Sequence, residues 1–215
     1  MKAVKPFRKL LEPLEDEGAK GVVPVFVETP KAHRNKYKYE PDLGLFTLGG
    51  VLPAGAVFPY DFGFVPYTRA DDGDPIDVLL FMDEPAFPGC LLAARLIGVL
   101  EAKQTEDGKT VRNDRLVGVA ACSRDHSRLS SPDDIEPDLR KEIEKFFIDY
   151  NEQKGRKFRP LGWFGPRRAL RLVKKARKEF DKSRWPALPS PSVTVQSKPG
   201  GESEPESEEK QKKKR

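Results

Sequence analysis

The sequence has few of the residues on which several kinds of functional site depend. Only two cysteines and two histidines occur among its 215 residues. Cys90 and Cys122 lie in apolar segments and show no CxxC spacing, so we expect two buried, reduced thiols rather than a disulfide. His33 and His126 are too few and too far apart in the chain to indicate a zinc site.

The sequence also lacks a long apolar run. Its longest apolar stretch, residues 90–100, contains Arg95 and is too short to cross a bilayer. The first 20 residues carry charges throughout, which is not the pattern of a secretory signal. These features predict a soluble, cytoplasmic protein without a membrane partner.

The net charge of +5 is unevenly distributed along the chain. Residues 166–186 contain nine Lys/Arg and two Asp/Glu, whereas residues 1–165 contain 24 Lys/Arg and 27 Asp/Glu. A solvated helix face accounts for the basic segment, and an anionic partner is the alternative. The segment has no interleaved aromatic residues and no recognisable nucleic-acid-binding fold, so we expect no nucleic-acid partner.

Short β-branched and aromatic segments, separated by Gly, Pro and Asp, predict a mainly β protein. The predicted strands cover residues 21–28, 36–40, 45–48, 76–82, 91–100 and 116–121. Pro24 inside the first segment indicates an edge position or a strand start, because proline has no N–H to donate. Many short strands favour a β-barrel or a strongly curved sheet.

The hydrophobic period changes near the C-terminus. Apolar residues from Leu139 to Tyr150 recur with helical spacing, and Pro137 is suited to the first helical position. A second predicted helix follows Gly165-Pro166 and has one apolar face and one basic face. We expect three parts: an N-terminal extension (1–20), one folded domain (21–182) and a low-complexity tail (187–215) too poor in apolar residues to fold.

The most informative pattern is the run Asp72-Gly73-Asp74-Pro75-Ile76-Asp77, which leads directly into an apolar strand. Two carboxylates ~4 Å apart repel by about 4 kcal/mol at an effective dielectric constant near 20. Folding therefore requires that cations, protons or water offset this repulsion. Carboxylate oxygens suit hard divalent cations such as Mg²⁺, which predicts a metal-dependent phosphate enzyme. An acidic turn that caps a strand is the alternative.

These segments, taken in order, resemble the soluble family I inorganic pyrophosphatases. The run from Asp72 to Val78 matches the aspartate motif of that family in full. Further segments that are similar to the family occur in the same order, at residues 25–30, 34–37, 58–64, 87–89, 146–150 and 155–157. The similarity extends from about residue 21 to residue 180, which is most of the predicted domain.

The resemblance implies a five-stranded OB-like β-barrel with flanking C-terminal helices, a class between mainly β and α+β. It implies hydrolysis of inorganic diphosphate to two phosphates with several Mg²⁺ ions per site, and a symmetric homo-oligomer, either a dimer or a hexamer. The implied metal contacts are Glu28, Asp72, Asp74, Asp77 and Asp114. Asp74 would also accept a proton from the attacking water. The implied phosphate contacts are Lys36, Lys38, Arg115, Tyr150 and Lys157.

The chain departs from the family pattern at several positions. Lys38 stands at the place of a family carboxylate, for which Glu40 is the alternative substitute. Gly50, Phe62 and Asn151 replace an arginine, a tyrosine and a lysine.

An insertion between residues 101 and 113 obscures the next part of the motif. Arg115 takes the place of a lysine, and the carboxylate role is left open among Glu106, Asn113 and Asp114. The alternative function is a catalytically weakened homologue that binds anions or another macromolecule through its basic helix and tail.

Overall fold

The computed structural model describes residues 21–40 and 43–183. The predicted N-terminal extension and the predicted low-complexity tail lie outside these residues.

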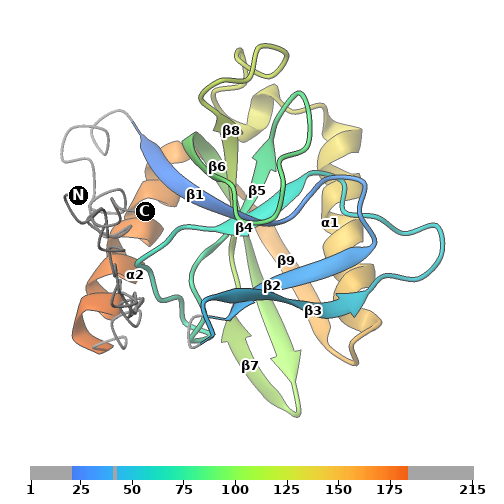
Figure 1. Cartoon of the computed structure of the whole chain (residues 1–215). Coiled ribbons are helices and arrows are strands. Elements are labelled where there is room, and N and C mark those ends of the chain that lie inside the picture. Colours follow the sequence, from blue (N-terminus) through green and yellow to red (C-terminus); the bar gives the residue numbers. More distant parts are fainter. Residues whose placement is uncertain (1–20, 41–42, 184–215) are drawn as a thin grey trace, which may run out of the picture.

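Five strands form a closed ring (Figure 1). In the order of pairing they are β1 (Val22–Thr29), β4 (Asp61–Phe64), β5 (Asp77–Phe81), β8 (Arg115–Ala120) and β6 (Leu91–Glu106). A further pairing of β1 with β6 closes the ring. The neighbours are antiparallel except β5 and β8, which are parallel and place Asp77 directly opposite Arg115. This confirms the OB-like five-stranded barrel.

Three smaller pieces of β structure extend the barrel. Strand β6 continues beyond the ring and pairs with β7 (Lys109–Arg112) and β9 (Lys157–Phe164). A separate two-stranded sheet consists of β2 (Asn35–Glu40) and β3 (Leu45–Val51). The insertion at residues 101–113 is therefore a β-hairpin continuous with the barrel wall.

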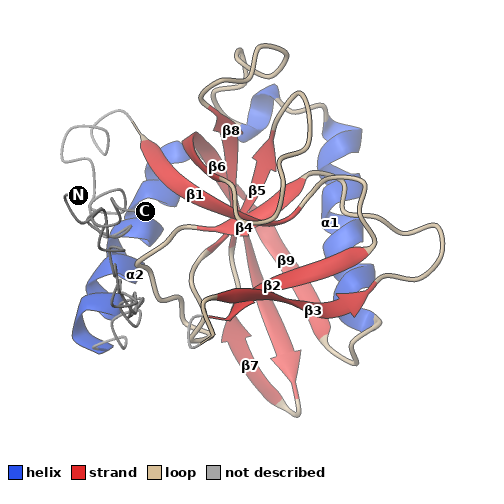
Figure 2. Cartoon of the chain, in the orientation of Figure 1, coloured by secondary structure: helices blue, strands red, loops and turns tan. Residues whose placement is uncertain are grey.

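Two helices lie on opposite sides of the strands (Figure 2). Helix α1 (Pro137–Glu152) begins with Pro137 at its first position, as predicted, and is preceded by the short helix η3 (Pro132–Asp134). Helix α2 (Pro166–Ser183) buries the small apolar residues Ala169, Val173 and Ala176, which leaves its basic face toward solvent. None of the helices in the described segments is long and apolar enough to span a membrane.

Alternation along the strands separates two apolar clusters. In β5, Val78 and Leu80 join the cluster that contains the apolar face of α2. Leu79 and Phe81 join the cluster that contains the apolar face of α1. Burial of each such side chain contributes about 1.5–3 kcal/mol, so the register of β5 is strongly specified. Asp77, two residues before Leu79, is thereby turned toward the α1 side.

The structure corrects some local expectations. Strands β4, β7 and β9 are absent from the predicted set, and β6 extends six residues beyond the predicted end at residue 100. The prediction for Pro24 is confirmed, because Pro24 lies where β1 pairs with β6, before the pairing with β4 begins at Phe26. The cysteines are free as expected, but the prediction that both are buried is wrong: Cys122 is exposed and Cys90 is half-buried.

Candidate active site

The aspartate motif forms a tight turn that leads into β5. Gly73 has φ +96°, a conformation that side chains other than glycine rarely adopt. The Asp74 N–H donates to Asp72 Oδ1 at 3.2 Å, and the Ala70 N–H donates to the Asp74 carbonyl at 2.8 Å. Two like-charged side chains are thereby held close together on one short turn.

Thr68 anchors the base of this turn. It is 1% exposed, its Oγ1 donates to the Val65 carbonyl, and the same oxygen accepts the Ile76 N–H at 3.0 Å. The two ends of the loop are thus joined through one buried hydroxyl. Its hydrogen bonds fix the position from which Asp77 enters β5.

Neighbouring carboxylates of the site contribute to raised pKa values at Asp72 and Asp77. Burial raises the pKa of Asp72 to about 6, with a further contribution from the charge of Asp77 and an opposing one from Arg115. Burial also raises the pKa of Asp77, against the lowering effects of Arg115 and Lys36, while Asp74 raises it further. The three aspartates therefore lie close enough to repel, which favours a cation among them.

Glu28, near the end of β1, belongs to the same group. It is 7% exposed, and its Oε1 accepts the Tyr39 N–H at 2.8 Å. Burial raises its pKa to about 7, although Lys36 and the hydrogen bond from Tyr39 lower it. The charge of Asp77 acts in the raising direction, which places Glu28 beside the aspartates.

Asp77 already has an internal partner. Arg115 Nη1 forms an ion pair with Asp77 Oδ2 and donates to Asn113 Oδ1. The guanidinium carbon lies 5.6–5.8 Å from the ring centres of Phe62, Phe147 and Phe158.

The oxygen donors fit a hard cation in chemical type. No group of three or more Asp, Glu, His or Cys side chains in the described part of the chain is arranged to hold a metal ion as it stands. The electrostatic coupling nevertheless identifies Asp72, Asp74 and Asp77 as the carboxylates that a cation would relieve. Glu28 stands behind them as a further oxygen donor.

Basic side chains face this acidic group. Lys36 lowers the pKa of both Glu28 and Asp77, and its Nζ lies 5.0 Å from the Phe62 ring centre. Burial and then the charges of Lys36 and Arg156 lower the pKa of Lys154, with a smaller contribution from Lys38. Cations held this close to one another repel, and an anion among them would offset that repulsion. We call Lys36, Lys38, Lys154 and Arg156 the basic wall.

Tyr150 lies close to members of both charged groups. Burial raises the pKa of its hydroxyl, and the charges of Arg115, Asp77, Arg156 and Glu28 all act on it. Its ring lies 4.7 Å from Lys154 Nζ. The hydroxyl is therefore protonated at neutral pH and is available as a donor to an anion.

Several expected contacts are not brought together. Asp114 Oδ1 accepts the Ala102 N–H at 3.0 Å and pairs with Arg112 at 2.7 Å. Asp114 lies between β7 and β8 with these two partners, so the structure does not bring it together with the aspartates, and its role as a metal ligand stays a prediction.

Four further residues named from the sequence also have defined positions in the structure. Glu106 pairs with Arg156 at 2.8 Å, which leaves the amide of Asn113 facing Arg115 where a carboxylate was expected. Lys157 is exposed at the start of β9, opposite Thr105, and within the described residues no hydrogen bond or ion pair joins it to the aspartates. Asn151 is buried and donates to the Phe147 carbonyl at 2.8 Å, so it serves the end of α1 rather than the site.

The β2–β3 hairpin carries two further departures from the family pattern. Gly50 pairs with Lys36, and the space where its side chain would begin is open. Lys38 remains on the hairpin with its Nζ 3.9 Å from Glu40. The hairpin thus carries two lysines, Lys36 and Lys38, and Glu40 forms an ion pair with Lys38.

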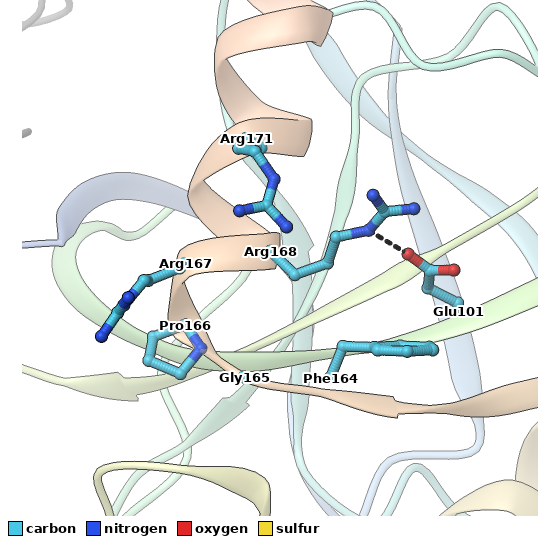
Figure 3. Close-up of a pocket in the computed structure, with 7 residues that line it drawn as sticks. All are labelled: Glu101, Phe164, Gly165, Pro166, Arg167, Arg168 and Arg171. Atoms are coloured by element: carbon cyan, nitrogen blue, oxygen red, sulfur yellow. Dashed lines mark hydrogen bonds and ion pairs between the residues drawn. The ribbon is translucent and has the colours of Figure 1, made fainter.

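A pocket of about 780 Å³ lies at the start of α2, next to Glu101 of β6 (Figure 3). Arg168 Nε reaches Glu101 Oε1 there at 2.5 Å, and Arg112 pairs with the other Glu101 oxygen. The pocket contains none of the residues predicted from the sequence to act on phosphate or metal.

Lys154 and Arg156 were not among the predicted site residues. Both follow α1 in the basic run Lys154-Gly155-Arg156-Lys157, of which residues 155–157 resemble the family. Gly155, with φ +71°, turns the chain there, and the Arg156 N–H returns to the Asn151 carbonyl at 3.0 Å. That turn directs the basic residues toward the hairpin.

Comparisons with known proteins agree with this arrangement. A family model described as inorganic pyrophosphatase matches residues 25–181. An inorganic pyrophosphatase from Synechocystis is 36% identical over 160 residues, 74% of this chain and 92% of the relative.

Solved structures give the same result. The crystal structure of an inorganic pyrophosphatase from Neisseria gonorrhoeae has a TM-score of 0.71 and 30% identity, covering 81% of this chain and 99% of that one. The one from Thermus thermophilus has a TM-score of 0.69 and 31% identity, covering 76% and 93%. The fold, the aspartate turn and the facing lysines thus agree with a single assignment: this chain belongs to the inorganic pyrophosphatase family.

Proposed function

We propose that this chain hydrolyses inorganic diphosphate to two phosphates with Mg²⁺. The observation that carries the proposal is that three mutually repelling aspartates lie close to the basic wall, with Tyr150 near both groups. An acidic group suits cations and a basic group suits phosphate oxygens, and a phosphoanhydride needs both. Family membership supports the same reaction.

Substrate binding falls to the basic wall. Lys36 and Lys38 approach from the hairpin, while Lys154 and Arg156 approach from the turn after α1. Together with the Tyr150 hydroxyl they offer N–H and O–H donors to the negative oxygens of diphosphate. Fixed donors of this kind stabilise charge that develops on a phosphoryl group during transfer.

The aspartates supply the other half of the reaction. Asp72, Asp74 and Asp77 would hold the metal, with Glu28 behind them. Mg²⁺, when bound, neutralises charge on the nucleophile and on the leaving phosphate. Asp74 is the exposed member of the trio and lies within the turn, where it would accept the proton from the attacking water.

A phosphate-release assay tests the proposal directly. The purified chain should release phosphate from diphosphate with Mg²⁺ and should lose this activity in excess EDTA. Asp74→Asn should reduce kcat by orders of magnitude without changing the thermal unfolding temperature by more than a few degrees. Asp71→Asn is the matched control, because neighbouring Asp71 is exposed and pairs with Lys175 instead. Near-normal turnover by Asp74→Asn contradicts the assignment of the proton acceptor.

We also propose that the protein is a symmetric homo-oligomer in the cytoplasm. Leu45, Leu48 and Val51 on β3 are each more than half exposed, which is unfavourable on a hairpin unless another surface covers it. Light scattering coupled to size-exclusion chromatography should show a dimer or hexamer, and Leu48→Lys should shift it toward the monomer. A wild-type chain that is monomeric at micromolar concentration contradicts the proposal.

A further inference from the structure

The residues that hold Arg115 form a buried polar chain beside the aspartates. Gln104 Oε1 accepts from Asn113 Nδ2 at 2.8 Å, and Asn113 Oδ1 in turn accepts from Arg115. All three side chains are buried. Because a guanidinium can only donate, the Asn113 oxygen must face Arg115, and the Asn113 amide nitrogen is then left to donate to Gln104.

Arg115 is also held in place by apolar groups. Its guanidinium lies among Phe62, Phe147 and Phe158, and it is 6% exposed. Within the described residues its Nε has no hydrogen-bond partner, although it is buried. A group enclosed in this way cannot swing out to follow a substrate, so its charge stays beside Asp77.

The chemistry of this position is that of a cation. Arginine remains charged at all accessible pH values and fits carboxylate geometry. It already forms an ion pair with Asp77, the aspartate that pairs directly with it across β5 and β8. The neighbouring position that faces it carries a neutral amide, and the two carboxylates nearby in the sequence, Glu106 and Asp114, are paired elsewhere.

We propose that Arg115 acts as a tethered cation that occupies one cation position of the carboxylate group, so that the site takes fewer divalent ions than its aspartates would otherwise bind. Gln104 and Asn113 are positioning residues that orient the guanidinium. The inference deepens the proposed function, since it concerns how many ions accompany that reaction. It applies to metal binding whether or not diphosphate is hydrolysed.

The test counts bound Mn²⁺ by titration with electron paramagnetic resonance detection, without diphosphate, on the full chain. Arg115→Gln removes the charge, whereas the matched variant Arg115→Lys keeps it. Arg115→Gln should bind one additional Mn²⁺, or bind Mn²⁺ about tenfold or more tightly, because a charge this close to a carboxylate has a large effect on a second cation. Arg115→Lys should resemble the wild type. The inference is overturned if Arg115→Gln matches the wild type, or if both variants gain Mn²⁺ equally, which would indicate a packing effect.

Arg115→Gln disturbs a buried contact, so a second variant guards against a chain that does not fold. Asn113→Asp is isosteric, and Gln104 can reverse its amide to donate to the new carboxylate. The new charge competes with Asp77 for the guanidinium and should tighten Mn²⁺ binding about tenfold. Unchanged Mn²⁺ binding in this variant also overturns the inference. Because the readout is metal binding, loss of phosphate release in any variant bears on the proposed function and not on this result.

Discussion

Replacing Glu28 with glutamine should change how the stability of the fold depends on pH, because burial disfavours the charged form of Glu28. Glu28 is buried and its pKa is raised from 4.5 to about 7. Because the folded-state pKa lies above the unfolded one, the bound proton stabilises the folded state fully below pH 4.5. That stabilisation is lost as the pH rises through about 7.

The size of the effect follows from the shift. One pKa unit corresponds to about 1.4 kcal/mol, so this shift corresponds to about 3 kcal/mol between pH 4.5 and pH 8.5. Glu28→Gln keeps the oxygen that accepts the Tyr39 N–H and cannot ionise. Relative to the wild type, the variant should therefore gain about 3 kcal/mol of unfolding free energy over this interval.

Urea unfolding in EDTA at several pH values between 4.5 and 8.5 measures this difference, and EDTA removes cations that would relieve the repulsion. Glu84→Gln is the control, because Glu84 is exposed in a loop. Its difference from the wild type should not follow the Glu28 profile. A difference between Glu28→Gln and the wild type that stays flat with pH would refute the reasoning, since it would mean that folding does not perturb this carboxylate.

Three further substitutions test the surroundings of the site. Lys154→Met should raise the KM for diphosphate about fivefold at low ionic strength and less at high salt, because Lys154 is only partly buried and its charge is screened by salt. Steady-state kinetics at two salt concentrations measure it. Thr68→Val should cost about 1–3 kcal/mol and also lower kcat, because the Ile76 N–H loses its buried acceptor and the aspartate turn loosens. Denaturant unfolding and phosphate release measure the two effects. Gly63→Ala should destabilise severely, by more than about 3 kcal/mol, because its Cβ would lie 2.1 Å from the Phe26 carbonyl oxygen, and soluble yield with circular dichroism checks this.

Each of these substitutions has a result that would count against it. Lys141→Met on the exposed face of α1 is the charge-matched control for Lys154, and equal effects on KM would show that the basic wall is not specific. For Thr68→Val, unchanged kcat together with reduced stability would mean that the turn does not depend on this anchor. Gly165→Ala meets no atom within 4 Å and should fold normally, so a well-folded Gly63→Ala would contradict the close approach of β1 and β4.

Much of the fold could be predicted because local patterns and packing agree. The run of apolar residues after Asp77 predicts a buried strand, and the helical spacing from Leu139 to Tyr150 predicts α1. Pro137 marks the start of that helix by its missing N–H. Strand β9 escaped prediction because Pro160 and Gly162 interrupt its pattern, and its existence depends on pairing with β6, more than fifty residues away.

Part of the site could likewise be predicted from local sequence, and part could not. The aspartate trio is recognisable from its spacing alone, because three carboxylates around one turn repel wherever that turn is placed. The position of Asp114 could not be predicted in this way, because Asp114 lies between β7 and β8 and its partners, Ala102 and Arg112, are set by the pairing of β6 with β7.

Sequence by itself therefore determined the elements whose causes are local: the acidic turn, the alternating strands, the amphipathic helices and the membership of a family. The tertiary structure alone decided which side chains meet. It brought Lys154 beside Lys36 and seated Arg115 against Asp77, because strand pairing and the closure of the barrel join segments that no local pattern connects.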